Sequence, residues 1–202
     1  MVEPKFNTED EIIAALKSGQ IVGIPTDTVY GLAADPLNAN ALKNLSQVKG
    51  RDTNQPIAVL FSELSDLDSY IENVDQLRGI ESFWPGALTA IVQAKRGKLI
   101  APLVTDQLTI GIRKPANETT LRILERAGGF LAVTSANRHD QTPASTAQEV
   151  TDIFGDEVPV LDGGVSFHGV ASTVVDFTGN TPRLLRQGVI EFKEVVTTWT
   201  AN

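Results

Sequence analysis

The sequence lacks cysteine altogether and contains only two histidines among its 202 residues. The absence of cysteine excludes a disulfide framework, thiol catalysis and cysteine-ligated zinc or iron–sulfur sites. With His139 and His168 alone a three-histidine metal site is impossible, and neither has a partner at a spacing typical of a catalytic triad, so we interpret both as surface loop residues. Neither G-x-x-x-x-G-K-[ST] nor a G-x-G-x-x-G after a predicted strand occurs. A phosphate-containing ligand must therefore be bound by residues other than these glycine-rich motifs.

Long hydrophobic runs are also missing. No apolar stretch approaches the roughly 18 residues of a membrane span. The N-terminal sequence MVEPKFNTEDEI carries acidic residues where a signal peptide needs a basic and then an apolar stretch. We therefore expect a cytoplasmic protein that has no membrane segment.

Positive charge is scarce overall, because 25 acidic residues face 17 basic ones and the formal net charge is −8. A protein of this charge does not coat nucleic acid by bulk electrostatics. Carboxylates are nevertheless absent from residues 82–105, 107–117 and 177–190, each of which carries lysine or arginine. We expect these segments to assemble a local cationic surface. The alternative is that the basic residues cluster by chance on solvated faces. We favour this alternative for the segment Lys95–Lys98 when it is taken by itself.

Hydrophobic periodicity alternates between helices and short apolar strands along the chain. A capping box at Thr8 and Glu11 opens the first predicted helix, which ends at Gly19. Further helices are predicted from Asn38, over 62–83 with a break near Asn73, from Asn117 to Gly128, and over 146–154 and 191–199. Strands are predicted over 21–24, 57–61, 87–92, 108–112, 130–133 and 158–161, with a closing hairpin of 172–177 and 183–185. No linker divides the chain, so we expect one α/β domain over residues 1–202, with a mixed sheet and flanking helices.

Six polar clusters lie along the chain, and we place them at strand ends, where open α/β sheets bind ligands. They are Pro25–Leu32, Lys49–Arg51, Arg113–Pro115, Thr134–Asn137, Ser172–Thr173 and Arg183–Gly188. Lysine supplies a point charge and arginine a bidentate guanidinium, which suit a polyphosphate and a carboxylate. Threonine, serine and asparagine supply neutral donors that orient small polar groups. Together the clusters predict a binding site.

Each cluster, taken alone, also has a purely structural interpretation. Thr26, Ser135 and Asn137 are common turn or helix-cap residues. Lys49 and Arg51 suit the end of a helix, where the macrodipole favours cations. The arginines of the last cluster suit an exposed strand. The combination of all six clusters is what favours a site.

In order and spacing, eight motifs resemble the YrdC-like family of threonylcarbamoyl-AMP synthases over residues 9–190. The motifs are PTDTVYGL at 25–32, KGR at 49–51, WPGALT at 84–89, IRKP at 112–115, TSAN at 134–137, DGG at 162–164, STVVD at 172–176 and LLRQG at 184–188. The resemblance implies the short, single-domain form of the family, a twisted mixed α/β sheet with a concave basic face.

The resemblance also implies a nucleotidyltransferase reaction. L-Threonine, bicarbonate or carbon dioxide, and ATP would give threonylcarbamoyl-AMP and pyrophosphate. The product would feed the threonylcarbamoyladenosine modification of tRNA through a separate threonylcarbamoyl-transferase complex. ATP is then a substrate, and Mg²⁺ is expected on its phosphates, held mainly by phosphate and water rather than by protein ligands. Adenylyl transfer depends chiefly on positioning and charge neutralisation, which suits a site without cysteine or catalytic histidine.

Site residues follow from the matched motifs. The resemblance carries catalytic and ATP-binding roles to Lys49, Arg51, Ser135 and Asn137, and further ATP contacts to Thr53 and Arg186. It carries threonine binding to Thr26, Arg113 and Ser172, with Arg113 as a clamp for the amino-acid carboxylate. The chain departs from the family pattern at Asp52, Gln55–Ile57 and Arg138–Gln141.

Two other functions stay open on the sequence alone. A protein that binds double-stranded RNA or tRNA, or that associates with the ribosome, would use the concave basic face, and the net charge of −8 weighs against it. The second alternative is a paralogue of the same fold that acts on another carbamoyl adenylate. Thr26, Arg113 and Ser172 argue against it, because they match the positions that bind L-threonine in the family.

Overall fold

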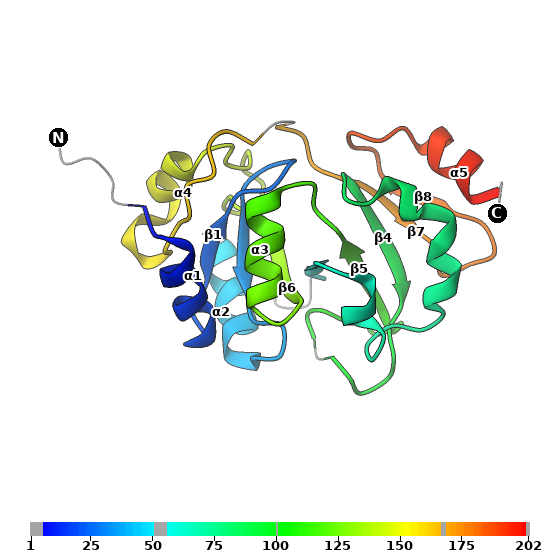
Figure 1. Ribbon diagram of the computed structural model, residues 1–202, viewed down its shortest axis with the longest axis horizontal. Coiled ribbons are helices and arrows are strands. Elements are labelled where there is room, and N and C mark those ends of the chain that lie inside the picture. The colour runs from blue at the N-terminus through cyan, green and yellow to red at the C-terminus, as the bar shows by residue number, and fades with distance from the viewer. Residues whose placement is uncertain (1–5, 51–55, 100, 167–168, 201–202) are drawn as a thin grey trace.

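A computed structural model describes residues 6–50, 56–99, 101–166 and 169–200 of the protein. These residues form one mixed sheet of eight strands in the order β1-β2-β6-β3-β5-β4-β7-β8. The strands are β1 Val22–Ile24, β2 Gly31–Ala34, β3 Ala58–Phe61, β4 Leu88–Gln93, β5 Thr109–Arg113, β6 Phe130–Ser135, β7 Thr173–Asp176 and β8 Arg183–Arg186. Pairing is parallel for β3 with β5 and for β4 with β7, and antiparallel elsewhere. The predicted α/β class with a mixed sheet is confirmed (Figure 1).

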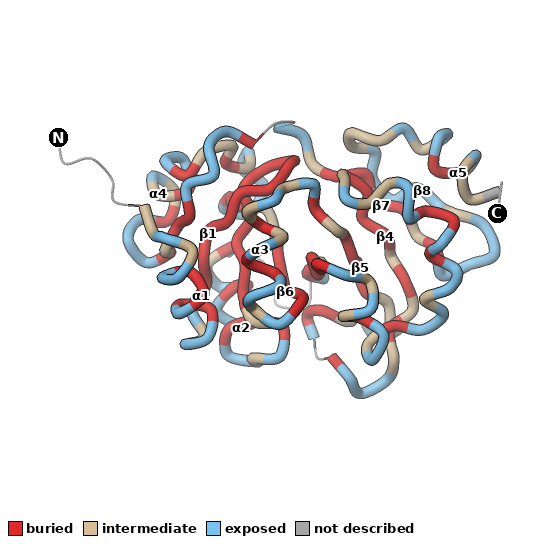
Figure 2. The backbone as a smooth tube through the Cα atoms, in the orientation of Figure 1, coloured by how far each residue is buried: buried red, intermediate tan, exposed pale blue. Residues whose placement is uncertain are grey.

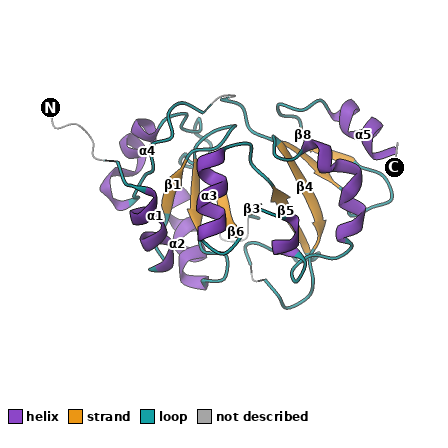
Figure 3. Ribbon diagram, in the orientation of Figure 1, coloured by secondary structure: helices purple, strands orange, loops and turns teal. Residues whose placement is uncertain are grey.

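Helices flank this sheet (Figure 3). They are α1 Glu9–Lys17, α2 Ala39–Lys49, α3 Glu118–Arg126, α4 Ala147–Phe154 and α5 Phe192–Thr200, with short 3₁₀ helices η1 Leu64–Leu67, η2 Val74–Phe83 and η3 Gly155–Glu157. The predicted capping box of α1 is present, with the Thr8 backbone N–H donating to the Glu11 carboxylate over 2.8 Å. Asn38 and Asn117 cap α2 and α3 as predicted. None of the helices within the described ranges is long and apolar enough to cross a membrane.

Apolar side chains pack on both faces of the sheet, because successive residues of a strand point to opposite sides. On one face, Leu16 of α1 and Ile123 of α3 belong to the same buried cluster as Leu131 of β6. On the other face, Leu42 of α2 shares a larger cluster with Ile112 of β5. Figure 2 shows the buried residues following the strands, while the outer sides of the helices and most loops are exposed. The sheet is therefore the rigid scaffold on which any site is built.

Three local predictions differ from the structure. The segment 158–161 is not a strand of the sheet but forms isolated bridges, one of them between Val160 and Gly23. Residues 62–83 form the 3₁₀ helices η1 and η2 instead of a long α-helix, with the predicted break at Asn73, whose φ is +51°. Strand β2 is missing from the sequence prediction, because Gly-Leu-Ala-Ala lacks the β-branched and aromatic residues typical of strands. Its two neighbours in the sheet impose the extended conformation.

Candidate functional site

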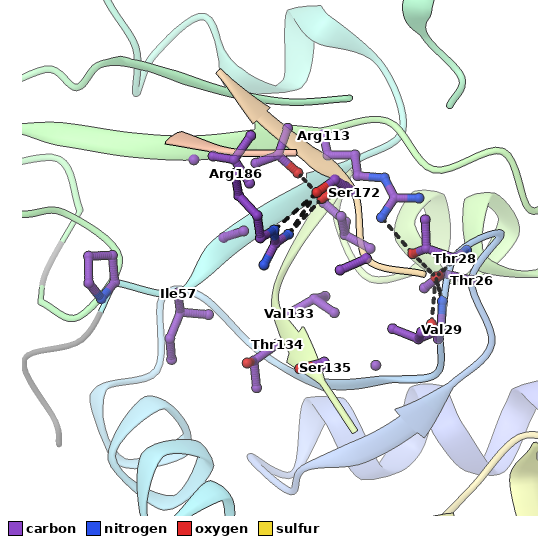
Figure 4. A pocket seen from close by; sticks show the side chains of 18 of the residues that line it. Thr26, Thr28, Val29, Ile57, Arg113, Val133, Thr134, Ser135, Ser172 and Arg186 are labelled. Carbon is purple, nitrogen blue, oxygen red and sulfur yellow. Dashed lines mark hydrogen bonds between the residues drawn. The ribbon is translucent and has the colours of Figure 1, made fainter. Parts of the chain in front are cut away.

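A cavity of about 300 Å³ lies on the face of the sheet (Figure 4). Alternating strand residues form its floor, among them Ala58 and Leu60 of β3, Gly111 of β5, Ile91 of β4 and Val174 of β7. The residues between them, such as Val59, Ile110 and Val175, are buried in the core of the opposite face. Residues of the polar clusters that we place at strand ends line its sides, while its floor is the face of the sheet. The ends of the strands supply the polar groups, and the small residues Ala58 and Gly111 leave space in the floor.

Lys49 meets the serine and the asparagine of the TSAN motif at one side of this cavity. Helix α2 ends at Lys49, and Gly50 adopts the left-handed conformation, with φ +70°, that terminates it. The buried Lys49 ammonium donates to the Ser135 carbonyl over 2.7 Å, to the Ser135 hydroxyl over 3.0 Å, and to the Asn137 side-chain oxygen. The Ser135 hydroxyl in turn donates to Asn137 over 2.7 Å. The expected convergence of Lys49, Ser135 and Asn137 is thus observed, and Ser135 lines the cavity.

Thr26 and Thr28 lie at another side of the cavity, in the loop between β1 and β2. The Thr26 hydroxyl donates to the Val29 carbonyl over 2.6 Å and lies 3.0 Å from the Thr28 hydroxyl. It also accepts the backbone N–H groups of Thr28 and Val29. The turn that the sequence left open as an alternative for Thr26 is therefore present. Both threonines nevertheless line the cavity, so the turn also presents their side chains to a ligand.

Arg113, at the end of β5, is held by three acceptors. Its Nε donates to the Gly86 carbonyl over 2.9 Å, its Nη1 to the Thr28 hydroxyl over 2.9 Å, and its Nη2 to the Asp27 carboxylate over 2.5 Å. Only 6% of the residue is exposed. Burial lowers the pKa of the guanidinium, and the adjacent Asp27 carboxylate opposes that shift. Arg113 therefore stays charged, as arginine does in proteins, in a position that faces the cavity.

Ser172 and Arg186 close the third side, at the start of β7 and the end of β8. Arg186 Nε and Nη2 donate to the Ser172 carbonyl over 3.1 and 3.0 Å, and Nη2 also reaches the Ser172 hydroxyl over 3.1 Å. The Ser172 hydroxyl is 2.7 Å from the hydroxyl of Thr89 in β4. Partial burial lowers the pKa of Arg186. Within the described residues no carboxylate pairs with Arg186, so its charge faces the cavity without a protein counterion.

Two of the predicted site residues, Arg51 and Thr53, lie outside the described residues. His139 is exposed in the loop after β6, as expected for a surface residue. The structure adds residues that the sequence reasoning missed: Thr89 and Gly111 on the floor, and Asp27 behind Arg113. Strand alternation is the signal that could have found Thr89, because it places Thr89 on the face opposite to the buried Leu88 and Ala90.

Carboxylate ligands for a metal are scarce around the cavity. The described part of the chain contains no group of three or more histidine, aspartate or glutamate side chains that could hold a metal ion. Asp27, between the lining residues Thr26 and Thr28, already bonds Arg113 and the backbone of Ala116. The polar side chains that line the cavity are arginines, threonines, serines and a tyrosine, a donor set that suits an anion.

The Sua5_yciO_yrdC family model, described as "Telomere recombination", matches residues 14–188. The chain belongs to this family. Among its Sua5/YciO/YrdC relatives, a Mycobacterium tuberculosis protein is 36% identical over 91% of this chain and 85% of its own length. The threonylcarbamoyl-AMP synthase of Bacillus subtilis is 34% identical over 96% of this chain and 58% of its own.

Solved structures of the family show the same fold. The crystal structure of Pyrococcus abyssi Sua5 complexed with L-threonine matches with a TM-score of 0.85 and 30% identity, over 96% of this chain and 58% of that one. Escherichia coli YciO matches with a TM-score of 0.81 at 24% identity, over 94% of this chain and 95% of that one. The chain thus spans little more than half the length of the Sua5 and Bacillus subtilis relatives, and nearly all of YciO.

Proposed function

We propose that this protein is a threonylcarbamoyl-AMP synthase, which joins L-threonine, bicarbonate or carbon dioxide, and ATP. One observation carries the proposal: five distant stretches of the chain come together at one cavity, where they place two chemically different sets of groups. Ser135, which lines the cavity, forms one set with its bonded partners Lys49 and Asn137. Thr26, Arg113 and Ser172, which all line the cavity, form the other. Family membership supports the assignment, as does the L-threonine bound to Pyrococcus abyssi Sua5.

The two sets take different substrates in this proposal. Arg113 offers a fixed guanidinium to the threonine carboxylate, while Thr26 and Ser172 offer hydroxyls to its other polar groups. Lys49, Ser135, Asn137 and Arg186 are assigned to the phosphates of ATP, and the motif resemblance assigns Arg51 and Thr53, which lie outside the described residues, to the same substrate. Arg186 bonds Ser172, so the nucleotide and amino-acid sides of the cavity touch at this contact.

The reaction needs no side-chain nucleophile. The threonine amine attacks the carbon of carbon dioxide and loses a proton to give a carbamate. A carbamate oxygen then attacks the α-phosphorus of ATP in line, and pyrophosphate leaves. The chain's contribution is to hold the carbamate oxygen and the phosphorus in that alignment and to offset the charge that develops on the phosphate oxygens. Lys49 and Arg186 supply positive charge and Ser135 supplies a neutral donor.

Mg²⁺ enters this proposal as the companion of ATP, where it neutralises phosphate charge. The described residues suit that arrangement because they supply cations and hydroxyls rather than a carboxylate cage. The whole reaction is that of a nucleotidyltransferase in the cytoplasm, carried out by a single domain over residues 1–202. Its product would pass to a threonylcarbamoyl-transferase complex that acts on tRNA.

Pyrophosphate release tests the proposed activity. Purified protein with ATP, Mg²⁺ and bicarbonate should release pyrophosphate when L-threonine is added, and D-threonine and L-valine should give the rate seen without an amino acid. The reason is that only a carbamate formed on the bound amino acid can attack the nucleotide. A rate of pyrophosphate release that does not depend on L-threonine would refute the assignment. RNA binding that persists with a steep salt dependence at saturating ATP and L-threonine would favour the RNA-binding alternative instead.

A substitution at Gly111 tests whether the substrate binds on the face of the sheet. A Cβ at this position would be 3.2 Å from the Ile91 Cδ1, 3.5 Å from the Thr89 Cγ2 and 3.6 Å from the Ala58 Cβ. The strand therefore tolerates a small side chain after slight adjustment, but the methyl groups of valine would occupy the floor of the cavity. Gly111→Val is expected to raise the KM for threonine by about tenfold or more, because it displaces the substrate from its productive position. Steady-state kinetics against Gly179→Val, in the β7–β8 turn, measures the effect, and an unchanged KM would place threonine elsewhere.

A further inference from the structure

Asp27 lies between the two threonines that line the cavity, yet it does not line the cavity itself. Its side chain is buried, and 7% of the residue is exposed. One carboxylate oxygen, Oδ1, accepts Arg113 Nη2 over 2.5 Å and the backbone N–H of Ala116 over 3.1 Å. The other, Oδ2, is buried and has no hydrogen-bond partner among the described residues. One oxygen therefore fixes the carboxylate, through bonds to Arg113 at the end of β5 and to Ala116 in the segment that follows β5.

This arrangement determines where the Arg113 guanidinium points. A guanidinium has five N–H donors in a planar fork. Three of them are taken, by Asp27 and Thr28 from the β1–β2 loop and by Gly86 from the turn before β4. The remaining donors are available to a ligand in the cavity that Arg113 lines. Asp27 is the only acidic member of the three acceptors, and the Ala116 backbone anchors it to the chain that carries Arg113.

We propose that Asp27 is a positioning residue: through Oδ1 it holds the Arg113 guanidinium in the orientation that receives the carboxylate of the amino-acid substrate. The identity of that carboxylate rests on the proposed function. Asp27 contacts no substrate, so its effect reaches threonine only through Arg113. What positions Arg113 is the acceptor atom, whereas what stabilises the buried guanidinium is the negative charge. Two substitutions separate these contributions.

Asp27→Asn keeps an oxygen acceptor for Arg113 and Ala116 and removes the charge, while Asp27→Ala removes both. Both variants leave a buried arginine without its counterion, so both should melt at a lower temperature than the wild type. Asp27→Ala is expected to raise the KM for threonine by about tenfold or more and to leave the KM for ATP unchanged. Asp27→Asn is expected to keep the KM for threonine within about threefold of the wild type, because the acceptor geometry survives.

Val150→Ala supplies the matched control. Val150 is fully buried in α4, outside the cavity lining, and its truncation lowers stability through packing alone. It should lower the melting temperature and leave both KM values unchanged. Equal losses of threonine affinity in the two Asp27 variants, or unchanged affinity in both, would overturn the positioning role. Wild-type protein that shows no threonine-dependent pyrophosphate release would instead refute the proposed function, so the two failures are distinguishable.

Discussion

Lys49→Ala is expected to lower kcat/KM for pyrophosphate release by about 10²- to 10³-fold, the loss that follows removal of one preorganised electrostatic group. The ammonium is buried and orients the Ser135 hydroxyl and the Asn137 amide at the edge of the cavity. Its removal takes away both a positive charge and one of the groups that join α2 to the loop after β6. Steady-state kinetics gives the turnover, and circular dichroism should show that the variant keeps its fold, because the core clusters are untouched.

Two further variants sharpen this result. Lys43→Ala removes an exposed lysine from the same helix and should behave as the wild type. Lys49→Arg should not restore activity, because a planar guanidinium cannot direct its donors to three converging acceptors as a compact ammonium does. A Lys49→Ala variant with wild-type turnover would show that the Lys49–Ser135–Asn137 cluster has no part in the reaction. The sequence motif predicts the same loss for Arg51→Ala.

Local signals in the sequence predict much of this fold. Thr8 with Glu11, Asn38 and Asn117 mark helix starts that the structure confirms, because a capping side chain satisfies backbone N–H groups within its own first turn. Nothing outside the segment is needed for such a signal. Strand β2 shows the opposite case: residues 31–34 are small and weakly strand-forming, and they are extended because β1 and β6 pair with them on both sides.

The candidate site was only partly predictable, because part of it also depends on contacts between segments that are distant in the sequence. Its charged and hydroxyl-bearing residues stand out in the motifs, and the structure brings Lys49 to Ser135 across 86 residues of sequence. Gly111 does not stand out, and nothing gives Thr89 a role although it ends the WPGALT motif, because a glycine or threonine in a strand acquires a role only when the sheet defines a face. Asp27 is quoted in a motif, but its contact with Arg113 depends on the tertiary fold. Sequence therefore indicates the chemistry of the site, and the packing of the sheet determines its shape.

Arg113→Met is expected to lower the free energy of unfolding by about 3–5 kcal/mol, the cost of leaving one charge of a buried pair without its partner. Both side chains of the pair are buried, and their atoms are 2.5 Å apart. The uncompensated Asp27 carboxylate, which also bonds Ala116, is what makes the loss large. The same variant should lose threonine binding, because the guanidinium is the proposed carboxylate ligand. Urea unfolding and isothermal titration with L-threonine measure the two effects separately.

A double-mutant cycle distinguishes the ion pair from simple loss of packing. Asp27→Asn combined with Arg113→Met removes both charges, while the asparagine oxygen still accepts the Ala116 N–H. The double variant should be more stable than Arg113→Met alone, with a coupling energy of about 1–3 kcal/mol, as found for residues in direct contact. It should still fail to bind threonine, because stability is restored without the guanidinium. Additive losses would mean that Asp27 and Arg113 stabilise the protein independently, and threonine binding by the double variant would remove Arg113 from the site.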